Sequence, residues 1–184
     1  MGLSEAAETR MEEALALAAG GDASAFARIV REHQAMVFSV AYHFLHDRPV
    51  AEDVAQEVFV HLYQNINSIE SPAHLKYWLR KVATHRSIDH ARGRKLEVGL
   101  DEISDCAGAS PECDPLLGEK LQRLVASLPE QARMVVILRY QEELEYHEIA
   151  EVMEMPINTV KSNLQRALAL LRQKLARTMG DVPV

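Results

Sequence analysis

The stretch from Glu97 to Glu119 divides the chain into two parts. It contains seven acidic residues and no Lys or Arg, set among Gly, Ser, Ala and Pro. A segment with so much charge and so little large apolar surface cannot form a core of its own. We therefore predict a flexible acidic linker at residues 96–114, with one helical domain at residues 1–95 and another at residues 115–178.

Composition supports two small helical cores and argues against several classes of protein. The chain has 184 residues and is 48% hydrophobic but only 5% aromatic, which favours aliphatic, helical packing. No uncharged apolar run is long enough to span a membrane, and the acidic N-terminus does not match a secretory signal, so we expect a cytoplasmic protein. Cys106 and Cys113 match no zinc pattern, and no Gly-rich phosphate loop is present. We expect no metal, no cofactor and no enzymatic activity.

Charge is strongly segregated along the chain. The net charge is −7, yet residues 72–95 carry +6 and residues 155–180 carry +5, which leaves −18 on the remainder. Because salt screens distant charges, such local patches matter more to a ligand than the total does. Both basic stretches are candidate nucleic-acid contacts.

The first domain is predicted to contain four helices with short connections, typical of a compact all-α unit. We expect them at about Ser4 to Ala19, from a capping Asp22 to Leu45, at about Pro49 to Asn65, and from Ser71-Pro72 through the basic stretch. Ser71 supplies a capping hydroxyl, and the ring of Pro72 presets the first helical φ angle.

The basic helix combines an apolar side with cations and flat rings. Leu75, Trp78, Leu79 and Val82 recur at helical spacing, with cations standing between them. Cations that follow phosphates and rings that stack on unpaired bases suit single-stranded DNA. We favour nucleic-acid binding over a solvated basic face for the helix as a whole. For Trp78 alone we favour packing in the core.

The second domain ends in a predicted helix-turn-helix. We expect helices over Leu116–Leu128, from Pro129 to Tyr140 and over Tyr146–Met153, then a turn with Pro156 and a long helix capped by Asn158 or Thr159. In that geometry the start of the second helix enters the major groove, and an ordinary αα-hairpin is the less favoured alternative. The donors and acceptors there are Asn158, Thr159, Lys161, Ser162, Asn163, Gln165 and Arg166.

Several motifs in order resemble the sigma-70 family of RNA polymerase sigma factors, in its extracytoplasmic-function (ECF) group. The runs AEDVAQEVF and WLRKVATHRSIDHARGRK are similar to region 2, and LPEQARMVVILRYQEELEYHEIAEVMEMPINTVKSNLQRALALLRQKL is similar to region 4. The resemblance covers residues 20–95 and 115–176. Five positions depart from the common pattern: His85 stands where Asn is frequent, Glu145 where a Ser or Thr cap is usual, Asn158 where Gly is common, Asn163 where Arg is common, and Gln165 where His is frequent.

The resemblance implies a function for each part of the chain. It implies that Asp53, Gln56 and Glu57 bind the β′ clamp helices of core RNA polymerase. It implies that the helix-turn-helix reads the −35 element and contacts the β flap. It also implies an anti-sigma factor as a partner and no small-molecule substrate. The −10 element would be recognised and melted by Lys76, Trp78, Arg80, Lys81, Thr84, His85, Arg86 and Asp89, with the loop at Arg92 to Lys95 supporting strand capture.

Two other interpretations account for less of the sequence. A stand-alone helix-turn-helix regulator would explain residues 115–177 but leaves AEDVAQEVF and the basic helix without a role. A metal hydrolase using His43, His46 and Asp47 has no matched set of acid, base or ligand residues to support it.

Overall fold

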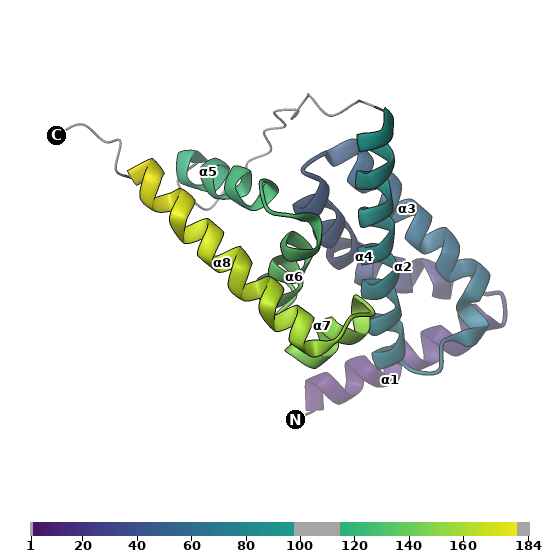
Figure 1. Ribbon diagram of the computed structural model, residues 1–184. Helices are drawn as coiled ribbons and strands as arrows, with labels where there is room; N and C mark the ends of the chain where they lie inside the picture. Colours follow the sequence, from purple (N-terminus) through teal and green to yellow (C-terminus); the bar gives the residue numbers. More distant parts are fainter. Residues whose placement is uncertain (1, 98–114, 180–184) are drawn as a thin grey trace.

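The computed structural model describes residues 2–97 and 115–179, in which every regular element is helical (Figure 1). The all-α prediction is therefore confirmed. The predicted linker, with Cys106 and Cys113, lies outside the described residues. The elements are α1 (Gly2–Ala19), α2 (Ala23–Leu45), α3 (Arg48–Asn65), the 3₁₀ turn η1 (Ile66–Ser68), α4 (Pro72–Glu97), α5 (Pro115–Ala126), α6 (Glu130–Tyr140), α7 (Tyr146–Val152) and α8 (Ile157–Met179).

Side-chain caps fix where the helices of the first half begin. The Asp22 carboxylate accepts from the backbone N–H of Ser24 at 2.7 Å, and the Ser71 hydroxyl accepts from the N–H of His74 at 3.1 Å. These bonds satisfy donors that the first turn of a helix leaves without partners. Both predicted caps are thus confirmed.

The turn before α8 differs from the prediction. The helix begins at Ile157, and the carbonyl oxygen of Pro156 accepts from the N–H of Thr159 at 2.8 Å. Asn158 and Thr159 therefore lie inside the first helical turn, and the prediction that one of them caps the helix was wrong. The left-handed residue of this turn is Glu154, with a φ of 51°.

The first half packs around α2, which contacts α1, α3 and α4. Ile29, Val37 and Phe44 of α2 are fully buried, as are Leu75 and Leu79 of α4. Leu75 and Leu79 belong to the apolar side that the sequence predicts for the basic helix.

The second half packs around α6, which contacts α7 and α8. Met134 and Leu138 of α6 are fully buried, and so are Ile149 of α7 and Val160 of α8. Residues from Met134 to Leu138 are buried all around the helix. A helix that is apolar on every side needs cover on every side, and α6 also contacts α2 of the first half.

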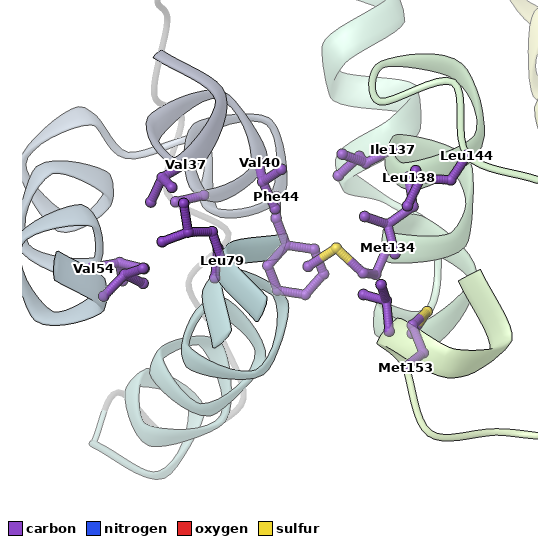
Figure 2. Close-up of a cluster of buried hydrophobic side chains, with 14 of the residues drawn as sticks. Val37, Val40, Phe44, Val54, Leu79, Met134, Ile137, Leu138, Leu144 and Met153 are labelled. Atoms are coloured by element: carbon purple, nitrogen blue, oxygen red, sulfur yellow. The ribbon is translucent and has the colours of Figure 1, made fainter. Parts of the chain in front are cut away.

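The two halves share one continuous core. Buried residues of both belong to a single hydrophobic cluster, in which the ring of Phe44 points toward Met134 (Figure 2). α7 also lies against α4, the basic helix (Figure 1). Within the described ranges, none of the helices has the length and apolar character needed to cross a membrane.

Candidate nucleic-acid interface

α4 carries the predicted −10 residues on several of its faces. Lys76 and Arg86 are exposed, and so is the acidic Asp89. Among the residues that the structure describes, none forms an ion pair with Lys76. Arg86 lies 3.9 Å from the carboxylate of Glu57 on α3. Lys76 and Arg86 are therefore exposed cations whose surroundings belong to the first half of the chain.

Arg80 points instead toward the second half of the chain. Its Nε donates to Oε2 of Glu142, in the turn after α6, at 3.1 Å. The two side chains are only 20% and 8% exposed. Breaking a guanidinium–carboxylate contact with so little water around it costs more free energy than breaking a surface pair, because the remaining charge is left buried without a partner.

Three more residues of the same face contact α7 and the turn that follows it. Lys81 lies 2.7 Å from the carboxylate of Glu154. The Tyr77 hydroxyl donates to the carbonyl oxygen of Glu151 at 3.3 Å, and His85 Nε2 donates to that of Val152 at 3.1 Å. The hydrogen bond between Lys81 and Glu154 raises the pKa of the lysine and lowers the pKa of the glutamate, so both stay charged.

Thr84 and Trp78 differ in how far they are buried in this arrangement. Thr84 is fully buried, and its hydroxyl has no hydrogen-bond partner among the described residues. Trp78 is partly buried against the core, with its ring 5.3 Å from that of His61. The preference for Trp78 as a packed residue is confirmed. The predicted −10 roles of both residues remain predictions.

The end of α4 is also paired with acidic groups. Arg94 donates to the carboxylate of Asp47 at 3.0 Å, and Arg92 lies 3.7 Å from the carboxylate of Glu130 at the start of α6. The side chain of Lys95 lies outside the described residues. Asp47 also caps α3 by accepting from the N–H of Val50 at 3.2 Å.

The predicted −35 residues gather in the first three turns of α8. Asn158, Lys161, Gln165 and Arg166 are exposed, whereas Thr159, Ser162 and Asn163 are half-buried. The structure thus brings all seven together on one stretch of helix after a tight turn. Lys161 lies over the ring of Tyr146, 5.8 Å from its centre.

The predicted polymerase-binding residues lie on the outer side of α3. Asp53 and Gln56 are exposed, but the Glu57 carboxylate accepts from His90 Nε2 of α4 at 3.1 Å. Gln56 also borders an open groove of about 820 Å³ between α2 and α3. The groove is mainly apolar, and its aromatic lining residues are Phe26, Phe38, Phe59 and Tyr63.

Sequence analysis missed three residues that join the halves: Glu142, Glu154 and Arg133. Sequence analysis assigned no role to Glu142 or Glu154. Arg133 donates to the carbonyl oxygen of Phe44 at 3.0 Å, at the C-terminal end of α2. No local pattern marks such residues, because each acts on a partner far away in the sequence.

The arrangement presents basic helical surfaces on α4 and at the start of α8. Across the described ranges, no group of three or more His, Cys, Asp or Glu side chains is placed to hold a metal ion. Asp47, one of the residues of the metal-hydrolase interpretation, caps α3 and pairs with Arg94. A short helix, a tight turn and a long helix with exposed polar residues define a helix-turn-helix DNA-binding protein that carries a second basic helix.

Comparison with known proteins narrows this class to one family. The family model for sigma-70 region 2 matches residues 29–97, and the model for sigma-70 region 4 matches residues 118–171. The ECF RNA polymerase sigma factor SigW of Bacillus subtilis is 32% identical over 170 residues, covering 84% of this chain and 91% of that one. The ECF sigma-E factor of Escherichia coli K12 is 30% identical over 170 residues, covering 84% and 88%.

A solved structure has the same fold. The sigma factor RpoE of Bartonella quintana, in complex with the anti-sigma factor NepR, matches with a TM-score of 0.68 at 20% identity, covering 82% of this chain and 96% of that one. Together with the family matches, these relatives place the chain in the sigma-70 family, among the ECF sigma factors. It binds core RNA polymerase and directs promoter-specific initiation of transcription.

Proposed function

We propose that three separate surfaces of the protein carry out polymerase binding and promoter recognition. The outer side of α3 binds the clamp helices of the β′ subunit, α4 captures the −10 element, and the start of α8 reads the −35 element. The protein supplies recognition and strand capture without catalysing a reaction, and it works in the cytoplasm beside RNA polymerase.

The exposed start of α8 is the observation that carries the −35 role. Its residues suit both phosphates and base edges, and they follow directly on the turn of a helix-turn-helix. The second basic stretch, α4, carries Lys76 and Arg86 in positions open to solvent. Trapping unpaired bases on such a helix offsets the few kcal/mol that unstacking each base costs.

The β′ contact is supported by the position of Asp53 and Gln56. Both are exposed, and Gln56 also borders the apolar groove between α2 and α3. A surface that combines an apolar groove with a polar, acidic margin has the anatomy of a protein interface. Glu57 is held by His90 and Arg86, and we assign it a contact at the edge of the same surface.

An anti-sigma factor is the remaining proposed partner. The Bartonella relative was solved as a complex with such a protein. We propose that this chain is likewise held by an anti-sigma factor that competes with polymerase.

The test is a pull-down of core RNA polymerase with the purified chain, followed by run-off transcription on fragmented genomic DNA. We expect binding and new start sites that share two sequence elements. Failure to bind polymerase, together with a shift of duplex DNA by the chain alone, would instead support a stand-alone regulator.

A further inference from the structure

A cleft between α1 and α2 lies apart from the three surfaces proposed above. α1 packs against α2 (Figure 1), and the cleft between them has a volume of about 370 Å³. None of its described lining residues borders the groove between α2 and α3. The family model for region 2 begins only at residue 29, so α1 lies before the segment that it matches. Membership of the family therefore assigns no role to this cleft.

The charged residues that line the cleft are mostly cations. Arg10 of α1 lies on one side, and Arg28 and Arg31 of α2 lie on the other. Glu32 is the one carboxylate among the described lining residues. All four side chains belong to exposed residues, so a ligand can reach them from solvent.

The three arginines keep most of their hydrogen-bond donors available. Arg10 Nε donates to the carbonyl oxygen of Ala6 at 2.8 Å, and Arg28 Nη2 donates to the carbonyl oxygen of Arg10 at 3.2 Å. Within residues 2–97 and 115–179, none of the three forms an ion pair with a carboxylate. Glu32 follows Arg28 by four positions, a spacing that permits an ion pair on a helix, yet the two do not pair. Since a guanidinium has five N–H donors, most remain free for a ligand.

Such a concentration of cations is unfavourable unless an anion binds to it. Arg28 and Arg31 lie one helical turn apart on α2, and the hydrogen bond from Arg28 joins them to the segment that carries Arg10. The chain as a whole has a net charge of −7, so the cluster does not simply follow from a basic composition. An anion held by all three guanidinium groups would remove their mutual repulsion.

The chemistry of the cleft favours phosphate groups. The planar fork of a guanidinium matches two oxygens of one phosphate, and three such forks can hold more than one phosphate group. The floor of the cleft is apolar, with Met11 half-buried and Ala14 fully buried. Its volume is at the lower end of the range of about 300–1,000 Å³ that small-ligand sites have. The cleft therefore suits a short phosphate chain, either free or attached to a nucleoside that packs on the floor.

We propose that the cleft between α1 and α2 binds a small anion with two or more phosphate groups. Arg10, Arg28 and Arg31 hold the phosphates, and the charge of Glu32 limits the affinity. The site is independent of the proposed roles of α3, α4 and α8. Because α1 also contacts η1 and α4, a ligand that joins α1 to α2 also stabilises the packing of the first half.

The site is tested by isothermal titration of the full chain with inorganic triphosphate and, separately, with ATP. We expect saturable binding with one ligand per chain. The double variant Arg28→Gln with Arg31→Gln should bind at least about tenfold more weakly, because it loses two charge-assisted contacts. The matched control is Arg48→Gln with Arg172→Gln, which removes the same charge from two exposed positions outside the cleft. Circular dichroism checks that both variants are folded.

Glu32→Gln provides a variant in which binding should improve. The change keeps the size of the side chain and removes the negative charge, so we expect triphosphate to bind about threefold more tightly or better. Glu143→Gln, at an exposed position outside the cleft, should leave the affinity unchanged. A gain in affinity cannot result from partial unfolding. Tighter binding of ATP than of triphosphate would identify a nucleotide as the source of the phosphates, whereas equal affinity would show that the phosphate chain alone is recognised.

Three results would overturn the proposal. The first is no saturable binding of either probe at millimolar concentrations. The second is binding that the Arg28 and Arg31 variant weakens no more than its control does, which would place the anion elsewhere on the chain. The third concerns a dye-labelled single-stranded oligonucleotide. If its binding depends on Arg28 and Arg31 while triphosphate fails to compete, the cleft belongs to a path for DNA instead of a small-anion site.

Discussion

The guanidinium group of Arg133, on α6, donates to the carbonyl oxygen of Phe44 on α2 at 3.0 Å and lies over the ring of the same residue. It also donates to the carbonyl oxygens of Ala126 and Leu128. One side chain thus ties the end of α2 to the turn between α5 and α6. Burial lowers the pKa of Arg133, but a guanidinium remains charged.

Arg133→Lys should destabilise the protein although it keeps the charge. An ammonium group cannot reproduce the planar fork that reaches three carbonyl oxygens or lie flat over the Phe44 ring. We expect a loss of about 2 kcal/mol in the free energy of unfolding, measured by urea denaturation. Arg172→Lys, an exposed position on α8, is the matched control and should change little. Equal stability of both variants would contradict the role assigned to Arg133.

His46 should make the protein less stable in acid. Burial, with smaller effects from Arg133 and His43, lowers the pKa of His46 from 6.5 to about 4. The unfolded chain therefore takes up this proton first as the pH falls, so the contribution of His46 is fully present above pH 6.5 and is lost as the pH falls to about 4.

His46→Asn is the variant that isolates this effect. The residue has a φ of 53°, a left-handed conformation that Asn tolerates. We expect the free energy of unfolding to fall less steeply between pH 6.5 and 4 in the variant than in the wild type. Burial also lowers the pKa values of His33 and His43, so some acid dependence should remain. If the free energy of unfolding falls as steeply in the variant as in the wild type, His46 is excluded as a source of the acid dependence.

Helical structure was predictable because it depends on local pattern. The caps at Asp22 and Ser71, and the helix boundaries at Ala19 and Pro129, are set by neighbouring residues, and the structure has them. The start of α8 was misplaced because Asn158 and Thr159 are good caps in isolation. The carbonyl of Pro156 accepts the first hydrogen bond of the helix, so Asn158 and Thr159 lie within the first helical turn instead of capping it.

The packing of the halves could not be predicted in the same way. Glu142 and Glu154 are two of the many acidic residues outside the two basic stretches, and nothing in their spacing distinguishes them from solvated residues. Their partners Arg80 and Lys81 are more than sixty positions away, so only the tertiary fold brings them together. The candidate DNA residues were identifiable from sequence, whereas their partners in the free chain were not.

Replacing Asp53 and Gln56 together by Ala should weaken binding to core polymerase about tenfold or more without unfolding the chain. Both side chains are exposed, so their loss removes contacts with the partner and none of the core. The affinity is measured by titration of labelled core enzyme, with circular dichroism as the check on folding. Replacing exposed Glu12 and Glu13 of α1 by Ala is the control. Unchanged affinity in the Asp53 and Gln56 variant would count against the docking surface on α3.

Lys161→Ala should reduce −35 binding by a similar factor on every sequence. The side chain is exposed at the start of α8, and we expect its ammonium to contact a phosphate, which carries no sequence information. Releasing one fewer counterion should lower the salt dependence of log Kd by about one unit per decade of salt. Arg172→Ala removes a cation from the exposed far end of the same helix and should change neither quantity. The measurement is a salt titration of duplex binding by the polymerase complex, on promoters that differ in their −35 bases. A loss confined to one sequence would place Lys161 on a base edge rather than on the backbone.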